Sequence, residues 1–270
     1  MKSSSTIQTS EGAAVLDKVF DIAELVADHP DGLSPGEISE RLGLPRPTVY
    51  RLVSLLTRRG YLSLGEDRRL RIGLAFLRIG SRAPVADWVR DHGRPVLWNL
   101  VNASGCASAQ IAVLDHGKAL FLERTSPSSA VFKLDLRAGD AVPLYCTALG
   151  KVFLAAAPKM EADVLLDGID LDRRTESTLT DRAALETEIA TVRGQGYALS
   201  IAEYAEDVWS VAAPVMVPWS GPLYSIGVSE HMWRHSPERV QAATRQVLAA
   251  AARLSGLLNN PAEATTTKAG

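Results

Sequence analysis

The stretch 34–60 constrains the fold most, because it contains start and stop signals for two consecutive short helices. Residues 34–37 read Ser-Pro-Gly-Glu, a capping box in which the serine hydroxyl and the glutamate carboxylate can satisfy each other's backbone amides. Proline loses no hydrogen bond at the first helical position, so the first helix is predicted over residues 35–42. Gly43 ends it, since glycine adopts the left-handed conformation readily. Two prolines then suit the opening turn of the next helix, which is predicted to end at Gly60.

The second helix is amphipathic and leads into a short hairpin. One stripe is expected to be buried because its apolar members fall at i, i+3, i+4 and i+7: Val49, Leu52, Val53 and Leu56. Two short strands, 61–64 and 70–72, flank the turn-forming pentamer 65–69. Two short helices followed by such a hairpin have the order of a winged helix-turn-helix.

An ordinary helical hairpin is the alternative, and the charge distribution favours DNA binding over it. Residues 11–40 carry eight acids and one base, whereas residues 46–82 carry nine arginines and two acids, a net charge of +7 hidden in a whole-chain charge of −2. Arginine is suited to bidentate contact with phosphate or guanine. The predicted DNA-binding residues are Arg46, Thr48, Tyr50, Arg51, Ser54, Arg68, Arg69 and Arg71.

Length and composition indicate a two-domain cytoplasmic protein. The chain has 270 residues, 46% of them hydrophobic, and no run of 18 apolar residues that would span a membrane. The N-terminus lacks an apolar signal core, and two cysteines do not make a disulfide framework. Flexible tails are expected at 1–10 and 259–270.

The remaining chain is expected to form an α+β effector domain. The predicted order is a winged domain at 11–73, a linker helix at 74–84 and a second domain at 85–258. The winged domain is predicted to open with a helix over 11–28, whose apolar stripe is Val15, Val19, Ile22 and Val26. In the second domain, helices are predicted over 85–104, 147–157, 181–194 and 236–258, and strands within 106–136, 197–219 and 223–229, with turns at 116–117, 127–128 and 220–222. Helices on both sides of an antiparallel sheet characterise a sensor-like α+β fold.

Four ordered blocks resemble the IclR-type (isocitrate-lyase-regulator-type) transcription regulators. They are GLSPGEISERLGLPRPTVYRLVSLLTRRGYL, VPLYCTALGKVFLA, VRGQGYAL, and VAAPV followed by IGVS. The resemblance covers roughly residues 11–258. It implies a winged helix-turn-helix joined by a linker helix to a GAF-like effector domain, with no cofactor and no enzymatic activity. It also implies homodimers, often paired into tetramers, and a small, frequently carboxylic effector that controls a catabolic operon.

Some positions depart from the family pattern. Pro47 stands where a small polar residue is usual, and Tyr145 and Cys146 stand where His and Ala are common. Only Glu203 survives of an acidic run, and one of the paired pocket serines is replaced by Gly227. These departures argue against a pocket for a two-carbon acid. The pair Tyr145 and Cys146 resembles the residues found in the branch of the family that controls aromatic-acid catabolism.

The candidate effector site is the start of the helix at 147–157. Amides in the first turn of a helix lack internal partners and carry the positive end of the dipole, so Ala148 and Leu149 can hold a carboxylate. The alternative is that Thr147 only caps this helix and Gly150 only lets it pack. The candidate effector-binding residues are Tyr145, Cys146, Thr147, Ala148, Leu149, Ser200, Trp209, Gly227 and Ser229.

The expected macromolecular partners are a palindromic double-stranded operator and a second copy of the chain. The linker's apolar residues are expected to bury against that copy: Leu74, Phe76, Leu77 and Ile79. Two other classes stay open. One is a redox or metal sensor that uses Cys106 and Cys146 or the pair His231 and His235, although no third metal ligand is evident. The other is an enzyme with a fused DNA-binding domain. HExxH and a Gly-rich phosphate loop are missing from the sequence, and residues 32–36, which have the GxSxG spacing, belong to the helix cap described above and not to a nucleophile elbow.

Overall fold

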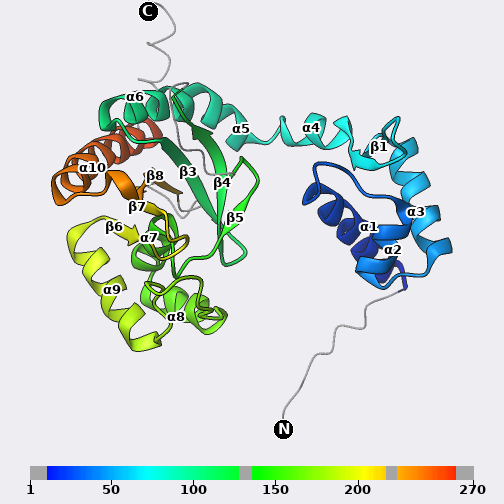
Figure 1. Cartoon of the computed structure of the whole chain (residues 1–270). Coiled ribbons are helices and arrows are strands. Elements are labelled where there is room, and N and C mark those ends of the chain that lie inside the picture. The colour runs from blue at the N-terminus through cyan, green and yellow to red at the C-terminus, as the bar shows by residue number, and fades with distance from the viewer. Residues whose placement is uncertain (1–10, 128–135, 217–223, 260–270) are drawn as a thin grey trace, which may run out of the picture. The chain divides into compact units, whose positions relative to one another are not determined.

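The computed structural model describes residues 11–127, 136–216 and 224–259 (Figure 1). The chain forms two compact units, Met1–Ala86 and Asp87–Gly270. The predicted tail at 1–10, residues 260–270 of the tail predicted at 259–270, the turn at 220–222 and Ser128 of the turn at 127–128 lie outside the described residues. Asn259, predicted to begin the C-terminal tail, instead ends the last helix.

The first unit is a winged helix-turn-helix. Its elements are α1 (Glu11–Ala27), α2 (Pro35–Leu42), α3 (Arg46–Arg58), β1 (Leu62–Leu64), β2 (Leu70–Ile72) and α4 (Leu74–Gly80). The capping box is confirmed, since the Ser34 amide donates to Glu37 Oε2 at 2.7 Å and the Glu37 amide donates to Ser34 Oγ at 3.3 Å. Gly43 ends α2 with a φ of 62°. The predicted α3 stripe is buried and packs with Ile22, Val26, Leu33, Ile38, Leu62 and Leu70.

Part of α1 and α4 carries apolar side chains that this core does not cover. Val15, predicted to join the buried stripe of α1, is 38% exposed, because the core reaches only the later turns of the helix that hold Ile22 and Val26. Leu16 and Phe20 on α1 are also exposed, as are Leu74 and Leu77 on α4. These side chains are available for contact with another molecule.

The second unit opens with an interrupted helix. It runs as α5 (Pro84–Trp88), a π-helical turn η1 (Val89–Gly93) and α6 (Arg94–Ser104). The π-helical turn interrupts the helix predicted over 85–104 just before Pro95, which cannot donate a backbone hydrogen bond.

A six-stranded antiparallel sheet in the order β5-β4-β3-β8-β7-β6 forms the centre of this unit (Figure 1). The strands are β3 (Ser108–Asp115), β4 (Lys118–Thr125), β5 (Ala141–Val142), β6 (Ala198–Ile201), β7 (Val208–Val215) and β8 (Tyr224–His231). One face packs against α6 and α10 (Pro237–Asn259). The other packs against α7 (Ala148–Ala156), α8 (Lys159–Asp167) and α9 (Arg182–Gln195). The predicted α+β class is confirmed.

Two local predictions need correction. No helix is predicted directly after residue 157, but α8 follows there with Pro158 as its N-cap, because proline suits a helix start as well as a helix stop. The strand region predicted over 197–219 is divided by the segment 202–207, where Ala202 adopts a left-handed φ of 56°. A short 3-10 turn, η2 (Met232–Arg234), also separates β8 from α10.

We expect the winged unit to lose stability in acid. Hydrogen bonds from the Ser34 amide and hydroxyl and from Arg69 lower the pKa of Glu37 from 4.5 to about 2, and Arg71 lowers the pKa of Asp67. A lowered folded-state pKa contributes stability above the unfolded value of 4.5, and that stability disappears as the pH falls through about 2. Circular dichroism should show the unit weakening between these two pH values, and Glu37→Gln should flatten that dependence. A wild-type profile unchanged across this window would contradict the argument.

Candidate functional site

The exposed side of α3 carries the predicted DNA-reading residues. Arg46, Tyr50, Arg51 and Ser54 are exposed and Thr48 is half-buried, whereas the opposite side of the helix is in the core. Within the described residues, Arg46 and Arg51 have no ion pair or side-chain hydrogen bond. Their guanidinium groups are therefore available to a phosphate or a base edge.

The wing arginines divide into two groups. Arg68 lies at the tip, exposed, with a left-handed φ of 59°. Arg69 instead pairs with Glu37 at 2.9 Å and donates to the Gly32 carbonyl at 2.9 Å. Arg71 pairs with Asp67 at 2.6 Å and donates to the Asp31 carbonyl. Arg69 and Arg71 thus hold the hairpin against the segment before α2, which gives both a structural role within the unit.

A small cavity lies where α7 begins against the sheet. Its volume is about 40 Å³. The lining comes from all six strands β3–β8, the start of α7 and neighbouring loops: Gln110, Phe121, Leu136, Val142, Thr147, Ala148, Leu149, Ser200, Tyr204, Val208, Ser210, Val211 and Ser229. Polar groups and helix amides therefore meet apolar walls at one point, as expected of a site for a small polar ligand.

Two residues in the first turn of α7, Ala148 and Leu149, line this cavity. Thr147 Oγ1 donates to the Pro143 carbonyl at 2.7 Å and accepts from the Gly150 amide at 3.1 Å, so Thr147 caps the helix. The amides of Ala148 and Leu149 are the first two of the helix and have no intrahelical acceptor. Ser200 Oγ donates to the Cys146 carbonyl at 2.9 Å, which ties β6 to the segment before α7.

The other predicted effector-binding residues lie around the cavity or away from it. Tyr145 is buried and donates to the Asp172 carbonyl at 2.8 Å. A side chain on Gly227 would overlap the Val211 carbonyl on β7, so this glycine allows close strand packing. Trp209 is fully buried in the core between the sheet and α10, on the face opposite α7. The cavity lining does not include four of the predicted residues: Tyr145, Cys146, Gly227 and Trp209.

Sequence reasoning missed a buried ion pair beneath the cavity. Lys151 on α7 is 1% exposed, and its ammonium donates to Glu203 at 2.7 Å, to the Leu199 carbonyl at 3.1 Å and to Glu188 at 3.2 Å. Burial raises the pKa of Glu203, while Lys151 opposes that shift. The available signal was a single lysine within the otherwise apolar stretch 148–157, since buried lysines require partners.

Gln110 and Ser210 were also missed. Gln110 is 3% exposed in β3, and its Nε2 donates to Ser229 Oγ at 2.7 Å. The signal was a lone amide in an otherwise apolar strand, which on its own does not reveal what the amide faces.

The structure favours neither the redox nor the metal alternative. Burial raises the pKa of the Cys146 thiol to about 11 and also raises the pKa of Cys106, whereas reactive cysteines have lowered pKa values. His231 ends β8 and His235 follows the 3-10 turn, so the two are not on one helix. The described residues contain no cluster of three or more His, Cys, Asp or Glu side chains that could hold a metal ion.

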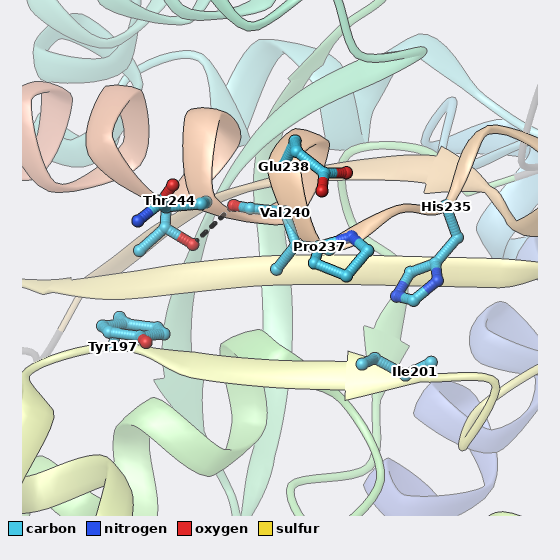
Figure 2. Close-up of a pocket in the computed structure, with 8 residues that line it drawn as sticks. Tyr197, Ile201, His235, Pro237, Glu238, Val240 and Thr244 are labelled. Atoms are coloured by element: carbon cyan, nitrogen blue, oxygen red, sulfur yellow. Dashed lines mark hydrogen bonds between the residues drawn. The ribbon is translucent and has the colours of Figure 1, made fainter.

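A larger, open groove lies between β6 and α10, with a volume of about 550 Å³ (Figure 2). Two of its polar side chains interact within the protein. Thr244 Oγ1 donates to the Val240 carbonyl at 2.8 Å, and the pKa of Glu238 is lowered by its own backbone amide and the Ser236 hydroxyl.

Comparison with known proteins identifies both units. Residues 15–64 match the family model for the IclR helix-turn-helix domain, and residues 87–256 match the model for the bacterial transcriptional regulator IclR C-terminal domain. The chain belongs to the IclR family. It is therefore a DNA-binding transcription regulator with an effector-binding domain, not an enzyme.

Individual relatives agree with this family assignment. The HTH-type transcriptional regulator BhcR of Paracoccus denitrificans is 30% identical over 249 residues, covering 92% of this chain and 88% of the relative. A crystal structure of an IclR-type transcriptional regulator from a Silicibacter species superposes with a TM-score of 0.76 at 26% identity, covering 90% of this chain and 96% of the other. An IclR homologue from Microbacterium hydrocarbonoxydans, crystallised with 4-hydroxybenzoate, superposes with a TM-score of 0.78 at 23% identity, covering 90% of this chain and 98% of the other.

The described residues include no helix long and apolar enough to cross a membrane.

Proposed function

We propose that this IclR-family regulator controls a catabolic operon in response to a small organic acid bound where α7 begins. The observation that carries the proposal is that Ala148 and Leu149, whose amides have no intrahelical acceptor, line the same cavity as three serines and Gln110. Helix N-termini bind carboxylates through free amides and the helix dipole. Among the described residues, the cavity lining includes no lysine or arginine, so the helix amides supply the positive potential for an anion, with the hydroxyls as further donors.

The size of the cavity bears on which acid binds. A volume of about 40 Å³ has room for roughly three water molecules, whereas an apolar cavity that admits benzene measures on the order of 150 Å³. An aromatic acid, suggested by Tyr145 and Cys146 and by the 4-hydroxybenzoate in one homologue, therefore requires part of the wall to move. Leu136, Tyr204 and Ser210 are the half-buried members of the wall, and Tyr204 lies under the Arg174 guanidinium at 4.9 Å.

A thermal-shift screen tests the acid-binding proposal. Short aliphatic acids and aromatic acids should raise the melting temperature, while their amides and methyl esters should not, because the helix amides recognise the negative charge. Ser200→Ala should weaken the response, since it removes a hydroxyl at the cavity that also fixes the segment before α7. Exposed Ser63→Ala in β1 serves as the matched control. Equal stabilisation by acids and uncharged analogues would reject the model.

The proposal includes a homodimer, assembled further into a dimer of dimers, on a palindromic operator. Its support is the uncovered apolar surface of α1 and α4, where Phe20 is 57%, Leu74 80% and Leu77 68% exposed. Burial of such side chains against a second copy removes apolar area from water. A twofold dimer also presents two α3 helices to a symmetric site.

We expect α3 and the wing tip to contribute differently to DNA affinity. Thr48→Ala and Arg51→Ala should relax sequence preference, each lost base contact costing about 1–3 kcal/mol. Arg68→Ala should weaken all sequences similarly and reduce the salt dependence, as expected for a phosphate contact. Fluorescence anisotropy with DNA from upstream of the gene and with scrambled DNA measures both effects, and light scattering of the same samples gives the protein mass.

Exposed Arg253 on α10 provides a control for loss of one positive charge. Its replacement by alanine should change neither preference nor salt dependence. Equal wild-type affinity for upstream and scrambled DNA, or a monomeric mass with binding intact, would contradict the operator and dimer proposals respectively.

A further inference from the structure

One buried polar atom of the cavity is left without a partner. Gln110 lies in the central part of the sheet, where it is opposite Arg124 of β4 and Gly227 of β8. Its Nε2 donates to Ser229 Oγ, but within the described residues its Oε1 accepts no hydrogen bond. The side chain is 3% exposed and lines the cavity at α7.

An unpaired amide oxygen at this depth requires an explanation, because buried polar groups are nearly always hydrogen-bonded. The bond to Ser229 orients the amide with its nitrogen toward the serine, which leaves the oxygen for whatever enters the cavity. That oxygen can only accept, so it calls for a donor on the ligand. Gln110 therefore selects a hydrogen-bond donor on the ligand, whereas the helix amides recognise an acceptor such as a carboxylate.

We infer that the effector is a short hydroxy acid, with its carboxylate at the start of α7 and its hydroxyl donating to Gln110 Oε1. This inference rests on the proposed acid-binding function. An amino acid also carries donors, but its ammonium would enter a cavity where no aspartate or glutamate among the described residues lines the wall to neutralise it. A hydroxyl supplies the donor without a charge, and the volume of about 40 Å³ suits an acid of few carbons.

The inference makes Gln110 a specificity-determining residue. Gln110→Met keeps the length of the side chain and removes both the oxygen that has no partner and the nitrogen that donates to Ser229 Oγ. Loss of the unpaired oxygen offsets loss of the hydrogen bond, so the unliganded variant should melt close to the wild-type temperature.

Isothermal titration calorimetry with matched acids provides the test. The probes are glycolate against acetate, lactate against propionate, and 4-hydroxybenzoate against benzoate. In at least one pair, wild-type protein should bind the hydroxy acid at least tenfold more tightly, and Gln110→Met should reduce that preference to less than threefold. The same change at Gln241, in the groove between β6 and α10, should leave the preference intact.

The outcomes separate this inference from the proposed function. If acids bind but no pair favours its hydroxyl member, the inference fails and the acid site stands. If the keto acids glyoxylate and pyruvate bind more tightly than glycolate and lactate, the amide presents its nitrogen to the cavity and the inference also fails. If no acid binds, or the methyl esters bind as well as the acids, the proposed function fails and the inference fails with it.

Discussion

Lys151→Ala is expected to destabilise the effector-binding unit by about 3–5 kcal/mol, because it leaves the buried Glu203 carboxylate without its cation. Lys151 is 1% exposed and Glu203 is 8% exposed, so water cannot replace the lost contact without rearrangement of the core. The loss is a large part of the 5–15 kcal/mol that stabilises a typical domain. Urea unfolding followed by tryptophan fluorescence measures it.

Two variants separate the ion pair from a general effect of mutation. Lys151→Met combined with Glu203→Leu should recover most of the loss, since replacing both members of a buried pair by apolar groups is often neutral. Arg182→Ala removes an exposed arginine that pairs with Asp167 and Glu186, and it should change stability little. A Lys151→Ala protein as stable as wild type would show that Glu203 is not held as a buried charge.

Gly150→Ala is the second large effect, with an expected loss of at least about 3 kcal/mol from overpacking. A Cβ at this position would lie 2.7 Å or less from the Cα, carbonyl carbon and carbonyl oxygen of Leu144. These are backbone atoms, so no change of rotamer relieves the overlap, and α7 must move away from the segment that precedes it. The same denaturation assay measures the loss, and effector binding should fall with it because the cavity lies at this contact.

Gly194→Ala is the matched control for Gly150→Ala. It lies in α9, where an added Cβ meets nothing within 4 Å. Alanine should therefore stabilise the helix by about 0.5–1 kcal/mol through its higher helix propensity. Destabilisation at both positions would indicate that the loss of glycine, not the overlap with Leu144, explains the effect.

The winged unit was predictable because its determinants are local in sequence. The capping box, Gly43 and the α3 stripe each depend on residues within one or two helical turns, and all three are confirmed. The start of α7 was predictable for the same reason, since Thr147 and the following amides belong to one turn. The two hydrogen bonds of Thr147 show that it caps α7, as the alternative to a role in effector binding predicted.

The cavity was only partly predictable because its partners are distant in sequence. Gln110 meets Ser229 across 119 positions, and Lys151 meets Glu203 across 52 positions, so neither contact can be read from spacing. Trp209 shows the same limit. Strand alternation places it on the face opposite Ser210, but the sequence does not reveal which of the two faces α7 covers.

The wing arginines could not be distinguished from one another by residue type, and only the structure shows that Arg69 and Arg71 form ion pairs within the unit.

In the proposed site, main-chain amides at the start of α7 hold the acid, whereas the other lining groups are side chains from separate strands and loops. A substitution at Ala148 or Leu149 changes the side chain and leaves the amide in place, provided that the helix still forms. Substitutions at Gln110, Ser200, Tyr204 or Ser210 change what surrounds the acid. During divergence, such a regulator can therefore exchange one metabolite for another by single mutations while keeping its response to acids, and proline at Ala148 or Leu149 is the substitution that would remove an anchoring amide outright.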